Sequence, residues 1–290
     1  SQNTHTAGSN SDSLPAGVTQ DWLKSLTDEN GNRILNEEEP ETDALQQNVL
    51  NGNAAGENYG RSAANAGDVN GDGFDDVIIG APNNNGGGLN GGKVYIYFGG
   101  TVIDNSPDVT GVDAAGNFAG FSVSSAGDVN GDGYDDVIIG AYGFSSFTGR
   151  AYIMYGGSPM NIVADVILTG EAAGHEFGKT VSGAGDLNGD GYDDVIVGAH
   201  AANAYTGKGY VFYGGAAMNN AADLVMSGEF SNDEFGCSVS GAGDVNADGF
   251  ADALIGAIGS NSSIGKSYVY LGGASMDNVS DITITGEGFL

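Results

Sequence analysis

The chain has 290 residues, a length that fits one large domain or two ordinary ones. It has 8 Lys and Arg residues against 38 Asp and Glu residues, a formal net charge of −30. This charge excludes passive binding to nucleic acid or to anionic membranes, which are themselves negative, and favours cations as partners. The single cysteine, Cys237, excludes an internal disulfide framework, and no apolar run approaches the ~20 residues that a membrane helix needs.

The first 42 residues differ in composition from the rest. Residues 1–17 are small and polar, and we expect a flexible tail there. Residues 18–42 predict one short helix, capped by Thr19 and carrying Trp22 on its apolar face, followed by an acidic connector. Residues 43–290 consist of repeats.

One stretch of mixed glycine and aspartate, followed by an apolar strand, occurs four times. It reads AGDVNGDGFDDVIIGA at 66–81 and AGDVNGDGYDDVIIGA at 126–141, and it recurs as AGDLNGDGYDDVIVGA at 184–199 and AGDVNADGFADALIGA at 242–257. The first aspartates of successive copies lie 60, 58 and 58 residues apart. A fixed period of this length indicates a repeat architecture.

Each repeat contains four short apolar segments bounded by turn residues, which predicts a unit of four antiparallel strands. The central two, such as DVIIG and YIMYGG, are apolar on both sides, as expected for strands between neighbouring sheets. One such unit cannot bury both of its faces alone, and radial stacking solves this. We therefore predict an all-β fold, a β-propeller of four-stranded antiparallel blades with a short N-terminal helix; a solenoid is the competing architecture.

The aspartate-rich stretch has the side-chain pattern of a calcium loop. In 128–136, oxygen-bearing side chains stand at positions 1, 3, 5, 8 and 9, and position 6 is Gly133. Calcium takes 6–8 oxygen ligands from a flexible ring, and a chain that wraps tightly around an ion needs glycine where the backbone turns. Helical calcium loops carry Glu at position 12, where this chain has Ile139 inside a strand, so Asp136 at position 9 must close the ligand set.

The fourth copy helps to separate ligands from neighbours, because it has Ala251 at position 8 and keeps the other oxygen side chains. We therefore expect side-chain ligands at positions 1, 3, 5 and 9, a backbone carbonyl ligand at position 7, and about four calcium ions per chain. The alternatives are a turn that binds nothing and a magnesium site. The predicted ligands are Asp68, Asn70, Asp72, Phe74, Asp76, Asp128, Asn130, Asp132, Tyr134, Asp136, Asp186, Asn188, Asp190, Tyr192, Asp194, Asp244, Asn246, Asp248, Phe250 and Asp252.

Half of the positive charge occupies one equivalent position in the repeats, at the start of the YIYFGG-type strand: Lys93, Arg150, Lys208 and Lys266. We expect these side chains to pair with the abundant carboxylates at strand ends. The alternative is a ring of cations that holds an anionic ligand.

Short motifs flank the loops. YG at 59–60 precedes the first loop and GAP at 80–82 follows its strand, while FG at 177–178 and at 235–236 precedes the third and fourth loops. On these motifs, residues 43–290 resemble the FG-GAP repeat of the integrin α-subunit propeller, which is also found in bacterial surface proteins. The resemblance implies a seven-bladed, calcium-binding propeller that serves adhesion outside the cell. This chain departs from that pattern in having four complete repeats.

An enzyme is not expected. The three histidines are His5, in the predicted tail, and His175 and His200, in variable segments of one repeat. No Ser/His/Asp pattern, Cys/His pair or phosphate-binding loop is present in the sequence. A calcium-dependent glycan-binding lectin is the main alternative, because loop aromatics such as Tyr142 and Tyr205 suit stacking on sugars; an accessory propeller of a larger secreted enzyme is another.

The strand count bears on assembly. Residues 43–52 occupy the repeat position of the outer strand, and residues 281–290 repeat it at the end of the sequence. Four repeats therefore carry five outer strands, and the extra one must be unpaired, seated in a partial fifth blade or paired with a neighbouring subunit. We expect an extracellular, secreted or cell-surface structural or adhesion protein, stabilised by calcium, that self-associates into a surface assembly or filament through its terminal strands and takes a protein or glycan as ligand. The alternative is a piece of a longer seven-bladed chain.

Overall fold

The structure is a computed structural model that describes residues 49–101 and 104–287. Contacts divide the chain into two units, Ser1–Gln47 and Asn48–Leu290, and the described residues all belong to the second. The predicted tail, helix and connector of residues 1–42 lie outside the described residues. So does most of the strand predicted at 43–52, and its described end, residues 49–52, forms no strand.

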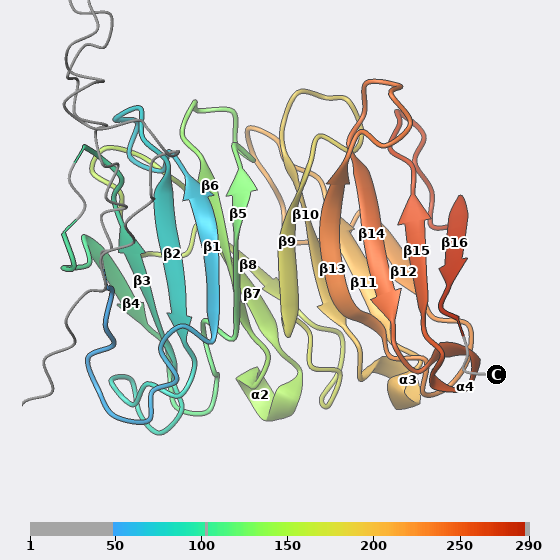
Figure 1. Ribbon diagram of the computed structural model, residues 1–290, viewed down its shortest axis with the longest axis horizontal. Coiled ribbons are helices and arrows are strands. Elements are labelled where there is room, and N and C mark those ends of the chain that lie inside the picture. The colour runs from blue at the N-terminus through green and yellow to red at the C-terminus, as the bar shows by residue number, and fades with distance from the viewer. Residues whose placement is uncertain (1–48, 102–103, 288–290) are drawn as a thin grey trace, which may run out of the picture. The chain divides into compact units, whose positions relative to one another are not determined.

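The described residues form four antiparallel sheets of four strands each, and within every sheet the strands follow chain order (Figure 1). This arrangement confirms the predicted all-β fold with propeller-type blades. The first sheet contains β1 (Ser62–Gly67), β2 (Asp76–Ala81), β3 (Lys93–Tyr97) and β4 (Val109–Val112); the second β5 (Ser122–Gly127), β6 (Asp136–Ala141), β7 (Arg150–Met154) and β8 (Val166–Thr169); the third β9 (Thr180–Gly185), β10 (Asp194–Ala199), β11 (Lys208–Phe212) and β12 (Leu224–Ser227); the fourth β13 (Phe235–Gly243), β14 (Asp252–Ala257), β15 (Lys266–Tyr270) and β16 (Ile282–Thr285).

The apolar second strands are buried on both faces because they lie between sheets. All six residues of β6 are buried. Ile138 packs in the core between the second and third sheets, whereas Ile139 packs in the core between the first and second. A third core joins the third and fourth sheets. Since a fully buried Ile contributes roughly 1.5–3 kcal/mol, these three cores hold the sheets together.

The Phe-Gly and Gly-Ala motifs sit where neighbouring sheets meet. The first strands of successive sheets contact each other, β1 with β5, β5 with β9 and β9 with β13. Phe177 is buried there and packs edge-on against Tyr210, with ring centroids 5.2 Å apart. A Cβ atom on Gly140 would lie 2.0 Å from the carbonyl oxygen of Gly178. Only glycine allows this approach, which explains why the two motifs recur together.

Three single-turn elements connect second and third strands: α2 (Phe144–Phe147), α3 (Ala202–Tyr205) and α4 (Ser260–Ser263). They are not regular helices, since Ser145 and Ser146 in α2 have φ angles of 48° and 59°. No helix in residues 49–101 and 104–287 is long and apolar enough to cross a bilayer. Because consecutive strands are antiparallel, these turns lie at the opposite end of the sheets from the aspartate loops (Figure 1).

Candidate metal centre

Each aspartate loop connects the first and second strands of its sheet. In the second sheet the loop leaves β5 through a β-bulge, a register shift between Ser125 and Gly127 where Gly127 pairs with Asp136. Gly127 has a φ angle of 73°, which favours glycine. The bulge turns the chain out of the sheet, and the loop folds back so that Asp136 starts β6.

The loop wraps around its first carboxylate. Oδ1 of Asp128 accepts hydrogen bonds from the backbone N–H groups of Gly131 at 2.7 Å and Asp132 at 3.1 Å, and Oδ2 accepts one from Gly133 at 2.9 Å. Gly133 has a φ angle of 90°, as expected at position 6. The first residue therefore organises the loop even without an ion.

The side chains at positions 1, 3 and 5 lie together. The backbone N–H of Asp132 donates to Oδ1 of Asn130 at 2.8 Å as well as to Asp128, so oxygens of both side chains converge on one nitrogen. The Asn130 amide in turn donates to Oδ2 of Asp132 at 3.0 Å. The same contacts recur in the other three loops. Three oxygen-bearing side chains are thus gathered on the exposed side of each loop.

The ninth residue lies beneath this group and is buried. Oδ2 of Asp136 accepts from the backbone N–H of Val129 at 2.9 Å, and Oδ1 accepts from Gly156 at 2.8 Å. Burial raises the pKa of Asp136 to about 7; the two hydrogen bonds oppose this shift, and the carboxylates of Asp132 and Asp128 add to it. Asp194 repeats the arrangement in the third loop, with its pKa also raised to about 7.

This donor set fits a calcium ion. Within residues 49–101 and 104–287, no three Asp, Glu, His or Cys side chains form a ready cluster for a metal. The loops instead combine aspartate and asparagine oxygens, several of which accept backbone hydrogen bonds. The carboxylates of Asp132 and Asp128 lie close enough to raise the pKa of Asp136, and the loop offers oxygen atoms as ligands. A hard divalent cation requires such a set of ligands. Positions 1, 3 and 5 would hold it, with position 9 behind them.

The aromatic residues at position 7 of the second, third and fourth loops pack on the preceding loop. The ring of Tyr134 lies over Gly71 of the preceding loop, where an added Cβ would be 2.5 Å from Cε1 of the ring. Tyr192 lies over Gly131 in the same way. The sequence predicted only a carbonyl ligand at this position, and the contact between loops was not foreseen.

The fourth loop differs from the others in the burial of its second residue and in the residue at its fourth position. Val69 and Val129, at position 2 of the first two loops, are fully buried, whereas the equivalent Val245 is 54% exposed. Position 4 is glycine in the first three loops, but it is Ala247 in the fourth, with a φ angle of 62°. No sheet follows the fourth among the described residues, so nothing in that part of the chain covers this loop.

The ring of basic residues pairs partly with carboxylates, as predicted. Lys208 lies 2.6 Å from Glu171, and Lys266 lies 2.8 Å from Glu229. Each glutamate follows the outer strand of the preceding sheet, so these ion pairs join successive sheets. Arg150 differs: its guanidinium carbon lies 3.4 Å from the centroid of the Phe144 ring.

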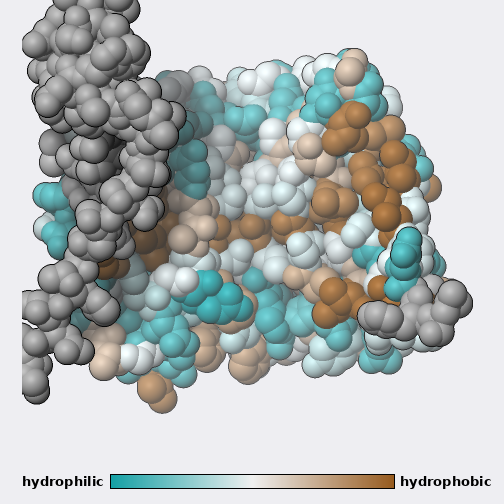
Figure 2. All heavy atoms as spheres, in the orientation of Figure 1, coloured by the Kyte–Doolittle hydropathy of each residue, from teal (hydrophilic) through white to brown (hydrophobic). Residues whose placement is uncertain are grey.

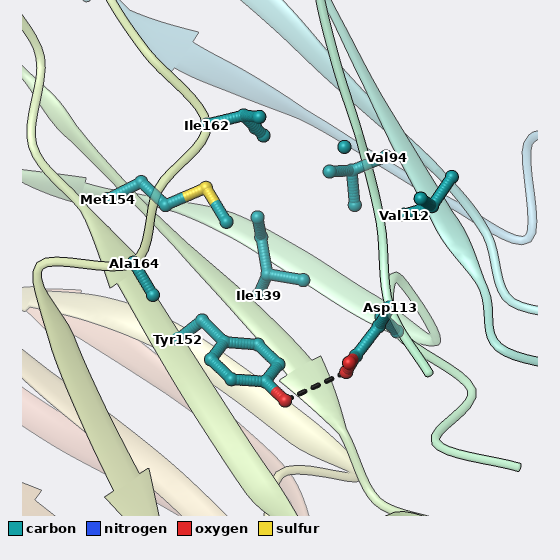
Figure 3. Close-up of a pocket in the computed structure, with 10 residues that line it drawn as sticks. Val94, Val112, Asp113, Ile139, Tyr152, Met154, Ile162 and Ala164 are labelled. Atoms are coloured by element: carbon teal, nitrogen blue, oxygen red, sulfur yellow. Dashed lines mark hydrogen bonds between the residues drawn. The ribbon is translucent and has the colours of Figure 1, made fainter. Parts of the chain in front are cut away.

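Two cavities lie away from the loops. An apolar crevice of about 160 Å³ opens between the first and second sheets, where the Tyr152 hydroxyl donates to Asp113 at 2.7 Å (Figure 3). A second hollow, of about 430 Å³, is lined by Cys237 and His200. Burial and the Lys179 charge lower the pKa of His200, and burial raises that of the Cys237 thiol. The thiol donates to the Gly256 carbonyl at 3.5 Å, and the His200 ring lies 3.4 Å from the Lys179 ammonium.

Comparison with known proteins agrees with this architecture. The FG-GAP repeat family matches residues 59–97, 119–154 and 177–212, which lie in the first three sheets. The chain is 30% identical to integrin alpha-5 of Xenopus laevis over 252 residues, 79% of this chain and 23% of that protein.

Other integrin α subunits match over similar stretches. Integrin alpha-PS2 of Drosophila melanogaster is 36% identical over 177 residues, 54% of this chain and 12% of the relative. Integrin alpha-8 of Gallus gallus is 30% identical over 235 residues, 74% and 21% respectively. The chain spans less than a quarter of the length of these relatives. In sequence motif and in sheet architecture, this chain is an FG-GAP repeat protein that resembles the integrin α-subunit propeller.

Proposed function

We propose that this protein is an extracellular structural or adhesion protein whose repeats are stabilised by calcium, without enzymatic activity. One observation carries the proposal: every loop sets a buried carboxylate, such as Asp136, behind a group of exposed oxygen side chains. Without a cation, these carboxylates repel one another. A divalent cation removes that repulsion and links the loop to the sheet.

The energetics of calcium binding support an extracellular location. Extracellular calcium sites of this kind bind with a Kd of ~10⁻⁴ M, and in roughly millimolar calcium each contributes about 1.4 kcal/mol to the free energy of unfolding. Four sites then add about 5–6 kcal/mol, as much as the whole stability of many domains. Cytosolic calcium would leave such sites empty.

Isothermal titration with calcium, together with melting curves in calcium and in EDTA, tests the proposal. We expect about four ions per chain and a higher melting temperature in calcium. Asp132→Ala should remove one site, whereas the control Asp75→Ala, at position 8 of the first loop, should leave the count unchanged. Identical melting curves in calcium and EDTA would contradict the proposal.

We further propose that the protein self-associates through the outward face of its fourth sheet. In β16, Ile282 and Ile284 are 46% and 56% exposed, whereas the equivalent Val166 and Leu168 of β8 are 7% and 0% exposed. A groove of about 400 Å³ runs along this face. Figure 2 shows apolar residues gathered over this end of the described unit. The groove is lined by Cys237, Leu254, Ile258, Ile264 and Ile284, among others.

A second copy is the occupant that suits this face. In the inner sheets the same face is covered by the next sheet, whose lysine pairs with a glutamate, as Lys266 does with Glu229. Glu287 holds the equivalent position after β16 and has no cationic partner among the described residues. The matching surface on a second copy surrounds Lys93 and Tyr95 in the first sheet. Residues Leu50 and Tyr59 pack over part of that surface and must move for the copies to stack.

Light scattering over a range of concentrations in calcium tests this association. We expect Ile284→Arg to give a monomer, because it places a charge in the apolar contact. The matched control is Ile167→Arg in β8. Ile167 is 39% exposed, and this substitution should leave assembly unchanged. A wild-type chain that stays monomeric at all concentrations would rule out the association.

A further inference from the structure

The aspartate loops are joined to one another through position 8. The carboxylate of Asp135, in the second loop, accepts a hydrogen bond from the backbone N–H of Asp68 at 2.8 Å. The backbone N–H of Asp135 donates to the carbonyl of the same Asp68 at 3.2 Å. Asp68 supplies the first predicted ligand of the first loop. Its main chain is therefore held on both sides by a residue that lies 67 positions later.

The next pair of loops repeats this contact. Asp193 accepts from the backbone N–H of Asp128 at 3.0 Å and donates its own N–H to the Asp128 carbonyl at 3.2 Å. An added Cβ on Gly67 or Gly127 would lie 2.2 Å or 2.1 Å from the carboxylate oxygens of Asp135 or Asp193. The glycine before each loop thus leaves room for the carboxylate of the next one.

The last pair provides an internal exception. Ala251 stands at position 8 of the fourth loop and still donates its backbone N–H to the carbonyl of Asp186 at 3.0 Å. It has no carboxylate, so it cannot accept the N–H of Asp186. Its Cβ lies 2.9 Å from a Cβ that would be added to Gly185, which places Ala251 in the same relationship as Asp135 and Asp193.

The first loop provides a natural control. Asp75, at its position 8, has no preceding aspartate loop among the described residues. Its carboxylate accepts instead from the side-chain amide of Asn65, in its own sheet, at 3.1 Å. The residue type is the same as in Asp135, but the contact stays within the sheet.

We propose that the position-8 carboxylate is a positioning residue for the calcium site of the preceding sheet. Asp135 serves the loop of residues 68–76 and Asp193 serves the loop of residues 128–136, while the loop of residues 186–194 lacks this support. The inference rests on the proposed calcium function. It assigns two effects to the carboxylate: it fixes the main chain of the first ligand, and its negative charge would favour a cation bound in that loop.

Each position-8 carboxylate therefore affects the calcium site of the loop that precedes its own loop in the sequence. A substitution at position 8 acts on the neighbouring loop more than on its own. A merely local role predicts the opposite, because Asp135 adjoins Asp136 in the second loop. This difference makes the two readings separable by measuring each loop individually.

Hydrogen exchange of loop amides during a calcium titration resolves the loops. For Asp135→Ala we expect the calcium concentration that half-protects residues 68–76 to rise about tenfold, the equivalent of one charge-assisted hydrogen bond. The value for residues 128–136 should change less than about twofold. Asp135→Asn keeps an acceptor and removes the charge, so it should give an intermediate shift. A larger shift at 128–136 than at 68–76 overturns the proposal.

A substitution that adds the missing carboxylate tests the same role by a gain of calcium affinity, which a misfolded variant would not give. Ala251→Asp should lower the half-protecting calcium concentration of residues 186–194, and the control Asp75→Ala should shift no other loop. No change at 186–194 with Ala251→Asp, in a folded protein, counts against the positioning role.

A calcium-free measurement separates this inference from the proposed function. In EDTA, Asp135→Ala should speed exchange of the Asp68 amide while Asp75→Ala leaves it unchanged. That result would uphold the contact between loops even if the wild-type chain bound no calcium. Equal exchange of the Asp68 amide in all three proteins overturns the positioning role.

Discussion

The carboxylate of Asp136 ties the start of β6 to Gly156, just beyond β7, through a hydrogen bond of 2.8 Å. Its other oxygen accepts from Val129 inside the loop. The residue predicted to close the ligand set is therefore also a structural bridge between loop and sheet. Equivalent bonds join Asp194 to Gly214 and Asp252 to Gly272, both at 2.8 Å.

Asp136→Ala should destabilise the protein with or without calcium. The substitution removes the side-chain acceptor of the partly buried Gly156 N–H and one of the two acceptors of the Val129 N–H, at a cost of about 1–3 kcal/mol. Asp132→Ala, on the exposed side of the same loop, should lower stability only in calcium. Urea unfolding of both variants in calcium and in EDTA measures the difference, and equal losses in EDTA would contradict the bridging role.

The calcium-free protein should become less stable as the pH rises from about 4 to about 7. Asp136 and Asp194 have pKa values of about 7 in the folded protein, above the usual value of 3.8. The folded state therefore binds more protons than the unfolded state in this range, and the free energy of unfolding falls as these protons are lost. Melting temperatures in EDTA at pH 5 and pH 8 measure the effect.

Calcium should reverse this dependence, because the ion favours the ionised carboxylates and displaces their protons. Titrations with calcium at pH 7 in buffers of different ionisation enthalpy should reveal proton release. The variant Asp136→Asn should release fewer protons. Binding without proton release would show that Asp136 and Asp194 do not take part.

Salt should raise the melting temperature at saturating calcium. The net charge of −30 gives strong repulsion across the folded protein, and salt screens interactions between exposed charges over about a Debye length, ~10 Å at 0.1 M. Melting curves between low and high NaCl, with calcium held constant, test this. A melting temperature that falls as NaCl is added would refute the expectation.

Ala247→Gly should stabilise the fourth loop. Ala247 has a φ angle of 62°, a left-handed conformation that costs an L-residue about 1–2 kcal/mol and glycine far less. The calcium affinity of this loop should increase by severalfold. The converse variant, Gly131→Ala, should weaken the second loop more strongly, because its Cβ would also lie 2.5 Å from the Tyr192 ring. Site-resolved calcium titrations compare the two.

The sequence predicted the strands well because their signals are local. The apolar runs of β2, β6, β10 and β14 and the glycines that end them recur at a fixed period, so four copies support each assignment. The pairing of Lys208 and Lys266 with glutamates also follows from composition, since carboxylates greatly outnumber cations. Local pattern and net charge were enough for these features.

Contacts between repeats were harder to foresee. Position 8 was set aside because Ala251 replaces aspartate there, yet Asp135 meets Asp68 across 67 residues. The replacement does mark position 8 as dispensable for its own loop, but it could not reveal a partner in another sheet. Similarly, the sequence could not show that Cys237 lies partly exposed on the fourth sheet, whose outer face the described residues leave uncovered.

The contacts between successive sheets have a mechanical consequence. Among the described residues, the extensive contacts between sheets join each sheet to its neighbours, and the carboxylates of Asp135 and Asp193 each reach the loop of the sheet before their own. Under a pull applied at residue 287, the fourth sheet bears the load first, and its release frees the loop of residues 186–194 for the next step. Each step would release about 58 residues of unfolded chain, which span roughly 200 Å when extended. With the proposed calcium sites, we expect the sheets to unfold one repeat at a time under load, with a resistance to force that rises with the calcium concentration.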